Sequence, residues 1–230
     1  MKFLVLIFFV ATLPVLSLAQ SVTREQKLKQ ITDLIAQIRA IEVQLLAPSP
    51  QDLSQAKAEG FEVFRLMPRE TFGRVLLHQG GGAFYSFTSS SNDYQKGAQI
   101  EFQQNHLSVG FGGADYGFLF DLGSIPLNYV DREIPVVAFL VSYRAPKKIS
   151  EVRKEQRKAF NYETDAGTLN DRIPAIVGHT YILRSINFDR ADILVALKII
   201  RKDTDGSLIC FWQKIETFET PIIIRDKSED

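Results

Sequence analysis

The stretch IEFQQNHLSVGFGGADYGFLFDLG, residues 100–123, decides the fold class. Apolar and polar side chains alternate along it, which is the period-two pattern of a half-buried β-strand. A two-residue turn at 104–105 places Phe102 opposite Leu107, so that apolar side chains meet across a hairpin. A second reversal at 113–116 brings the chain back beside the same hairpin. We therefore predict neighbouring antiparallel strands that run up, down and up and share one apolar face.

The glycines of this stretch raise the alternative of a phosphate-binding loop. Gly112 and Gly117 flank the second reversal, and Gly113 lies inside it. A phosphate loop needs glycines that lead into a helix, because free N–H groups at the helix N-terminus hold the anion. Here a strand is predicted to follow. The glycines therefore indicate a tight reversal in which positive φ values are tolerated.

The same register places polar side chains in a row on the opposite face of the sheet. The row contains Glu101, Ser108 and Asp121. Because adjacent strands are about 4.8 Å apart, the two carboxylates would lie at a separation that supports inverting glycoside hydrolysis. A solvated sheet face is the favoured interpretation, since Gln103 and His106 lie on the same side. Glu101 and Asp121 are thus candidate catalytic residues only under an alternative hypothesis.

The region before the first strand predicts two helices, at residues 20–60. A helix from Thr23 to Leu46 begins with a capping box formed by Thr23 and Gln26. A second helix starts after Ser49 and ends at Gly60. The first helix carries an apolar stripe at spacings of three and four, made of Leu28, Ile31, Leu34, Ile35, Ile38, Ile41 and Leu45. We expect this stripe to pack on the protein's own sheet, and self-association is the alternative.

The rest of the chain is predicted to be mainly β. Short runs rich in Val, Ile, Phe and Tyr indicate further strands at 74–79, 83–88, 134–143, 180–187, 192–202 and 207–216. The last two form a hairpin around the reversal at 203–206. Residues 147–160 carry a thin apolar stripe among many charges and predict a surface helix, at about 148–160. Residues 161–178 are expected to form a long irregular connection.

These elements together predict one domain. Residues 61–224 form an antiparallel β domain, preceded by the helices and followed by a disordered tail at 225–230. The fold class is α+β and mainly β: an antiparallel β-sandwich or open barrel with an N-terminal helical element.

Residues 1–19, MKFLVLIFFVATLPVLSLA, predict a signal peptide. One lysine precedes an apolar run, and Ser17 and Ala19 supply the small residues of a cleavage site. Pro14 breaks the run short of the about 20 residues needed to span a bilayer. We therefore expect a secreted or periplasmic protein with no membrane span after cleavage. Cys210 is the single cysteine, so no intramolecular disulfide can form.

Composition and spacing narrow the function classes. The chain has 27 Lys+Arg and 27 Asp+Glu, so no clustered basic surface is indicated and no nucleic-acid partner is expected. His78, His106 and His179 lie far apart and lack the spacing of a ligand pair, so we predict no metal site. No motif calls for a cofactor. Cys210 lies among apolar residues in the sequence, which favours a buried core residue over a nucleophile.

Aromatic residues in predicted loops give the leading functional hypothesis. Tyr94, Tyr116 and Tyr162 fall in such loops, where amphipathic rings serve as stacking platforms for sugars or partner proteins. Gln103 and His106 on the polar sheet face are further candidates for ligand binding. Because nucleophile, base and metal constellations lack support, we expect an exported non-catalytic binding or interaction module, with a glycan or a protein as its ligand.

Two other hypotheses stay open. One is a glycan-directed hydrolase that uses Glu101 and Asp121 as paired carboxylates. The other is a structural envelope protein that forms a homo-oligomer through the helix at 23–46. The sequence favours a non-enzymatic protein over the glycan-directed hydrolase.

Overall fold

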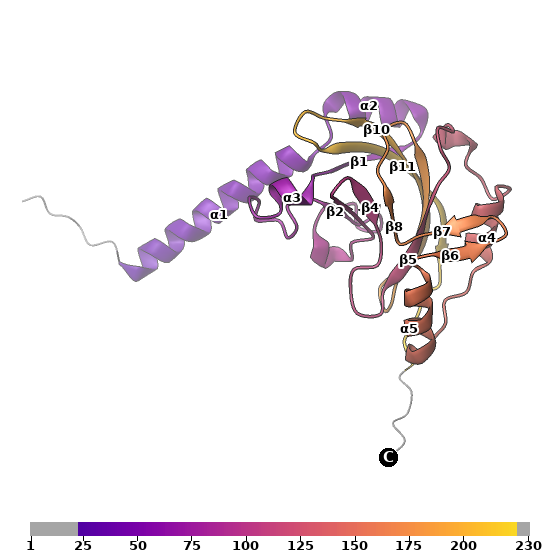
Figure 1. Ribbon diagram of the computed structural model, residues 1–230. Helices are drawn as coiled ribbons and strands as arrows, with labels where there is room; N and C mark the ends of the chain where they lie inside the picture. Colours follow the sequence, from indigo (N-terminus) through magenta and orange to yellow (C-terminus); the bar gives the residue numbers. More distant parts are fainter. Residues whose placement is uncertain (1–22, 225–230) are drawn as a thin grey trace, which may run out of the picture. The chain divides into compact units, whose positions relative to one another are not determined.

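The computed structural model describes residues 23–224 (Figure 1). The signal peptide predicted at 1–19 and the tail predicted at 225–230 lie outside this part of the chain. The chain divides into two units between Gln37 and Ile38. The division falls within helix α1 (Arg24–Leu46), whose last turns belong to the second unit together with every other element.

The two N-terminal helices are those that the sequence predicts. Thr23 Oγ1 accepts a hydrogen bond from Gln26 N at 3.2 Å, and Gln26 Oε1 accepts one from Thr23 N at 2.8 Å, which completes the capping box of α1. Helix α2 (Pro50–Glu59) begins at Ser49, whose hydroxyl accepts from Asp52 N. It ends at Gly60, which adopts a left-handed conformation with φ +79°.

The apolar stripe of α1 does not cover the sheet in the last turns of the helix. The exposed members there, at 42%, 65% and 38%, are Ile38, Ile41 and Leu45. The side chains that face the body are Glu42 and Leu46, and the buried Glu42 carboxylate accepts from Leu77 N and lies 2.8 Å from His78 Nδ1. The predicted packing of the stripe is therefore wrong for 38–46, because this polar contact sets the rotation of the helix.

The larger sheet is antiparallel, with strand order β1-β11-β10-β9-β5 (Figure 1). Its strands are β1 (Glu62–Leu66), β5 (Tyr116–Asp121), β9 (Thr180–Asn187), β10 (Ala191–Lys202) and β11 (Leu208–Phe218). The predicted strands at 180–187, 192–202 and 207–216 are confirmed as β9, β10 and β11. The hairpin reversal is confirmed as well, since Asp203 N donates to Ser207 O at 2.8 Å.

The smaller sheet has strand order β2-β3-β4-β8. Its strands are β2 (Phe84–Tyr85), β3 (Ile100–Gln103), β4 (His106–Ser108) and β8 (Arg172–Pro174). A separate hairpin consists of β6 (Tyr162–Thr164) and β7 (Gly167–Leu169). The region 161–178 is thus strand-containing, contrary to the predicted irregular connection, because its strands are only three residues long and carry little periodic signal.

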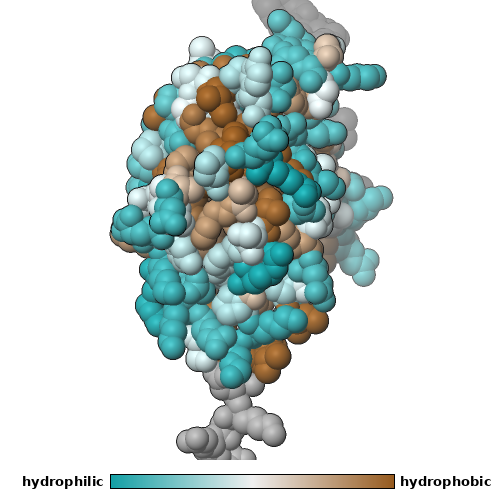
Figure 2. Space-filling model, turned by 90° about the vertical axis from the view of Figure 1, so that its right-hand side faces the viewer, coloured by the Kyte–Doolittle hydropathy of each residue, from teal (hydrophilic) through white to brown (hydrophobic). Residues whose placement is uncertain are grey.

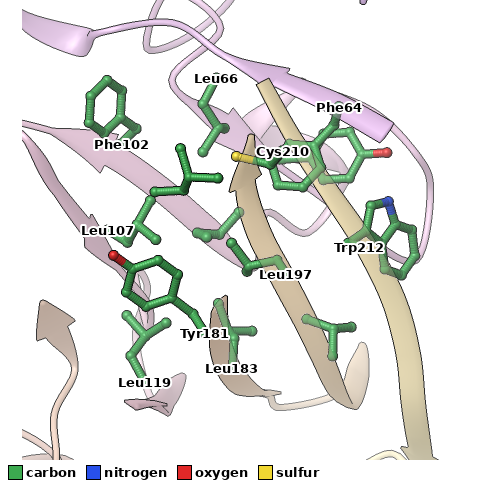
Figure 3. Packing of buried hydrophobic residues seen from close by; sticks show 14 of the residues in the cluster. Phe64, Leu66, Phe102, Leu107, Leu119, Tyr181, Leu183, Leu197, Cys210 and Trp212 are labelled. Carbon is green, nitrogen blue, oxygen red and sulfur yellow. The ribbon is translucent and has the colours of Figure 1, made fainter. Parts of the chain in front are cut away.

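One apolar core lies between the two sheets (Figure 3). It joins Phe102 and Leu107 of the smaller sheet to Leu183 and Leu197 of the larger one. Cys210 is buried in this core, and desolvation raises the pKa of its thiol, as expected for a packing residue. The fold is therefore an antiparallel, sandwich-like α+β fold.

A second core covers the other face of the larger sheet. Helices α4 (Pro135–Ser142) and α5 (Ile149–Lys158) pack there through buried residues such as Leu140 and Val152. Along β9, Leu183 faces the first core and Ile182 the second, so the strand is buried on both sides. On the side of the body that carries α4, β6 and β7, apolar side chains gather in the middle of a hydrophilic rim (Figure 2).

Two predicted strands are absent. The predicted strand at 134–143 is instead the helix α4, Pro135–Ser142. Pro135 at the first helical position favours a helix, and a short apolar run is compatible with a buried helix as well as with a buried strand. Residues 74–79 form turns after the short helix α3 (Arg69–Phe72) and run into Gly80, which has φ +78°. The predicted surface helix at 148–160 is confirmed as α5.

The opening stretch is confirmed in its first half and wrong in its second. Phe102 pairs with Leu107 around a turn with positive φ at Gln104 and Asn105. Strand β5, however, does not return beside β4: it pairs with β9 in the larger sheet, while β4 pairs with β8. Gly110, with φ +84°, lies where the chain crosses between the sheets. The apolar face of β5 must be buried, but the sequence pattern does not indicate which sheet supplies the neighbouring strand.

Candidate functional site

The structure separates the two carboxylates of the predicted row. Glu101 is buried on β3 in the smaller sheet, where it pairs with Arg69 and accepts a long hydrogen bond from Ser108. Asp121 ends β5 in the larger sheet and lies 2.9 Å from His179 Nδ1. The row across three strands is therefore wrong, and the carboxylate pairing that supported glycoside hydrolysis loses its geometric basis.

The three candidate tyrosines also separate. Tyr116 is buried at the start of β5, and Tyr162 lies in β6 with its ring against Phe118 and Tyr143. Neither sits in the loop where the sequence places it. Only Tyr94 belongs to a loop segment, the short 3₁₀ helix η1 (Tyr94–Lys96).

The two polar candidates on the smaller sheet are neighbours in the β3–β4 hairpin. Gln103 pairs with His106 across the hairpin, and His106 Nδ1 lies 2.7 Å from Gln104 O. They do not line the cavity that contains Tyr94.

Tyr94 lines a cavity of about 440 Å³ that opens to solvent, which we call the Tyr94 pocket. Its size falls within the range of small-molecule sites. Segments far apart in sequence form it: η1, the turn at 111–115 and the β9–β10 turn at 187–190. Its aromatic and charged lining side chains are those of Tyr94, Phe111, Asp115, Phe188, Asp189 and Arg190.

The aromatic side chains of the pocket are positioned by contacts with the body of the protein. Asp93 caps η1 by accepting a hydrogen bond from Gln95 N at 3.0 Å. The ring of Phe84 packs against Tyr94 with centroids 4.8 Å apart and against Phe111 at 5.3 Å. Tyr94 and Phe111 are therefore placed by a buried ring that is itself part of the body.

The turn that carries Asp115 is fixed on both sides. Asp115 N donates to Gly112 O at 2.7 Å, and Asp115 Oδ1 accepts from Phe188 N at 2.9 Å. From α5, Gln156 Nε2 donates to the carbonyl oxygens of Gly113 and Asp115, each at 3.0 Å. Burial raises the pKa of the Asp115 carboxyl above its usual value, and the Phe188 hydrogen bond offsets part of that increase.

Gly112 leaves an open space between two polar atoms. A Cβ at this residue would lie 3.8 Å from Asp115 Oδ2 and 3.9 Å from the Tyr94 hydroxyl oxygen. Both atoms therefore face the same empty point. Within residues 23–224, neither atom has a hydrogen-bond partner, whereas Asp115 Oδ1 is occupied. An incoming ligand can thus bond both atoms without displacing an internal contact.

Charges of both signs lie at the rim of the pocket. Asp189 and Arg190 are exposed, and Arg190 lowers the pKa of Asp115 while Asp189 raises it, both less than burial does. Among the residues that the structure describes, the lining contains no histidine, cysteine or serine. Across residues 23–224 no cluster of three or more metal-ligating side chains occurs. The arrangement is suited to holding a ligand by stacking and hydrogen bonds.

Sequence reasoning missed most of this site. The sequence places Asp115 in a reversal and Phe188 in the connection after the predicted strand at 180–187, and of the predicted ligand contacts only Tyr94 lines the pocket. The one available signal was that two turn segments, FGGAD at 111–115 and FDR at 188–190, each combine an aromatic and a charged residue. Nothing in either segment indicates that they meet.

Comparison with known proteins does not assign this chain to a family. The chain matches no family model, no curated protein and no solved structure. Between residues 23 and 224, none of the helices combines the length and apolar character needed to cross a bilayer.

Proposed function

We propose that this protein is a non-catalytic binding module whose ligand occupies the Tyr94 pocket. The observation that carries the proposal is the convergence of Asp115 Oδ2 and the Tyr94 hydroxyl on the space that Gly112 leaves open. Aromatic rings with a few convergent polar groups are the usual composition of a small-molecule site. The signal peptide predicted at 1–19 supports a role outside the cytoplasm.

Binding is favoured over hydrolysis by the state of the carboxylates. Glycoside hydrolysis needs two carboxyl groups on either side of the scissile bond. One oxygen of Asp115 is committed to Phe188 N, and Asp189 is an exposed residue of a turn with φ +60°. We therefore assign Asp115 the role of a hydrogen-bond acceptor.

The direct test is a fragment screen followed by NMR on the protein from Gln20 onward, the mature chain that the sequence predicts. Ligands should shift amide signals of 94–98, 111–115 and 187–190 together, because these segments form one pocket. Gly112→Ala should abolish the shifts. Its methyl group fills the shared space, and the φ of Gly112 is not positive, so the backbone accepts alanine.

A hydroxyl deletion gives the matched control. Tyr94→Phe removes one of the two convergent atoms, and Tyr129→Phe makes the same change at an exposed tyrosine outside the pocket. The proposal fails if no compound shifts the pocket signals, or if Gly112→Ala leaves the shifts unchanged. Turnover of a bound ligand would replace the non-catalytic assignment with an enzymatic one.

Self-association through α1 is a second candidate, supported by the exposed side chains of Ile38, Ile41 and Leu45 in the second unit. A surface stripe of this kind is typical of helix pairing. If it operates, Ile38→Lys with Ile41→Lys should reduce the mass in solution to that of a monomer. Val43→Lys is the control, because Val43 is also exposed but lies about 200° around the helix from Ile41. A wild-type mass of one chain at all concentrations would exclude this candidate.

A further inference from the structure

We propose that the ligand of the Tyr94 pocket is an uncharged saccharide, a class that the pocket recognises by stacking one sugar ring and bonding adjacent hydroxyl groups. This inference rests on the proposed function and specifies its ligand. It follows from three properties of the pocket: its aromatic wall, its paired polar atoms and its mixed charge.

The aromatic wall suits the apolar face of a sugar ring. Tyr94, Phe111 and Phe188 line the cavity, and Phe188 is buried while the other two are half-buried. A pyranose presents C–H groups on its faces and hydroxyl groups around its edge. C–H groups pack favourably on aromatic faces, so the ring lies flat against such a wall while its edge stays free for hydrogen bonds.

The polar atoms suit the edge of the same ring. Asp115 Oδ2 only accepts hydrogen bonds when ionised, whereas the Tyr94 hydroxyl can donate or accept. Because both lie just under 4 Å from one point, a ligand there meets both with neighbouring groups. A sugar offers adjacent hydroxyls that donate to the carboxylate and accept from the phenol. Hydrogen bonds to an ionised acceptor are the stronger ones.

The charges favour an ionic ligand of neither sign. Asp115 and Asp189 repel an anion that Arg190 attracts, and Arg190 repels a cation that the two carboxylates attract. A cation would otherwise suit the aromatic rings. An uncharged polyhydroxyl ligand avoids both penalties. The volume of about 440 Å³ and the opening to solvent fit the end or a short segment of a longer glycan chain.

Calorimetric or NMR titrations with four probe types distinguish the outcomes. The probes are neutral disaccharides of glucose, mannose and N-acetylglucosamine, their longer oligomers, choline and inorganic phosphate. We expect a saccharide to bind, and Asp115→Asn to weaken binding about tenfold through loss of an ionised acceptor. Tyr94→Phe should weaken it less, Gly112→Ala should abolish it, and Tyr129→Phe should leave it unchanged.

The alternative outcomes separate this inference from the proposed function. Binding of choline or phosphate that Gly112→Ala abolishes, with no saccharide bound, overturns the ligand class and leaves a binding pocket. Saccharide binding that none of the pocket variants affects places the sugar elsewhere and overturns the inference. If neither the probes nor any fragment shifts the pocket signals, the binding function itself is overturned.

Discussion

Two neighbouring residues, Asp115 after a turn and Tyr116 at the start of β5, belong to opposite kinds of polar cluster. The Tyr116 hydroxyl lies 2.8 Å from the hydroxyl of Tyr143, which donates to Glu155 at 3.0 Å. Each of these hydroxyl groups has a protein partner, and burial raises the pKa of both tyrosines. Asp115, with Tyr94, instead directs an unpartnered oxygen into a cavity. The same residue types therefore stabilise the fold in one place and are available to a ligand in the other.

The two clusters differ in whether their polar atoms have hydrogen-bond partners within the protein, and not in residue type or burial alone. A buried polar group with all its partners is a structural element, and its removal leaves others unsatisfied. A polar group with a free oxygen at a cavity contributes little to stability. We therefore expect variants in the first class to lower the free energy of unfolding, and variants in the second to alter binding and leave the free energy of unfolding almost unchanged.

The largest effect is expected at the buried pair of Arg184 and Asp192. Arg184 Nε and Nη2 donate to the two carboxylate oxygens at 2.9 and 2.7 Å, and both residues are almost fully buried. Asp192→Ala leaves a buried guanidinium without its counter-charge and should lower the free energy of unfolding by about 3–5 kcal/mol. Urea unfolding measures this loss. Asp189→Ala, at the exposed rim of the pocket, should change stability by less than about 0.5 kcal/mol.

The next effect concerns a carboxylate whose pKa moves opposite to that of Asp115. The hydrogen bond from Arg201 lowers the pKa of Asp52 to about 2, against 3.8 in the unfolded chain. Because the folded pKa is the lower one, this pair stabilises the protein above pH 3.8, and the stabilisation is lost as the pH falls towards 2. Asp52→Asn should cost roughly 1–2 kcal/mol at pH 7.

The measurement for Asp52 is urea unfolding of both proteins between pH 2 and pH 7. The wild type should lose its advantage over Asp52→Asn as the pH falls through this window. A constant difference across the whole range would show that Arg201 does not bind the carboxylate in preference to its protonated form.

A smaller effect is expected from paired tyrosine variants. Tyr143→Phe removes the acceptor of the Tyr116 hydroxyl and a donor to Glu155, so it should lower the free energy of unfolding by about 1–2 kcal/mol. Tyr94→Phe deletes a hydroxyl with no protein partner among the described residues and should change it by less than about 0.5 kcal/mol. Equal losses in the two variants would mean that Tyr94 also has a structural partner.

The sequence was sufficient for elements whose signals are local. The capping residues Thr23 and Ser49, the two-residue turn at 104–105 and the long hairpin of β10 and β11 were all predicted correctly. Each begins with hydrogen bonds or side-chain pairs between residues that are close in the chain. The fold class followed from them.

Long-range pairing was beyond the sequence for physical reasons. An apolar face on β5 is buried equally well beside β4 or beside β9, so periodicity alone does not select the neighbour. The apolar run at 134–143 could be buried equally well as a helix or as a strand, and the structure has a helix there. The candidate site could not be predicted for the same reason, because its residues come together through long-range pairing. Asp115 lines the same pocket as Tyr94 only because the chain crosses between sheets after Val109, and of these two residues only Tyr94 is a predicted ligand contact.

The smallest effect, and one of opposite sign, is expected for Asp115→Asn. Burial raises the folded pKa of Asp115 above 3.8, with Asp189 and Arg190 as the nearby charges. The ionised carboxyl therefore disfavours the folded state above its folded pKa, and this cost disappears as the pH falls below 3.8. The asparagine amide oxygen still accepts from Phe188 N, so the variant should be slightly more stable than wild type at pH 7 and equal to it near pH 3. Urea unfolding at both pH values measures the difference. A loss of stability at pH 7 would instead place Asp115 among the structural carboxylates, with Asp52 and Asp192.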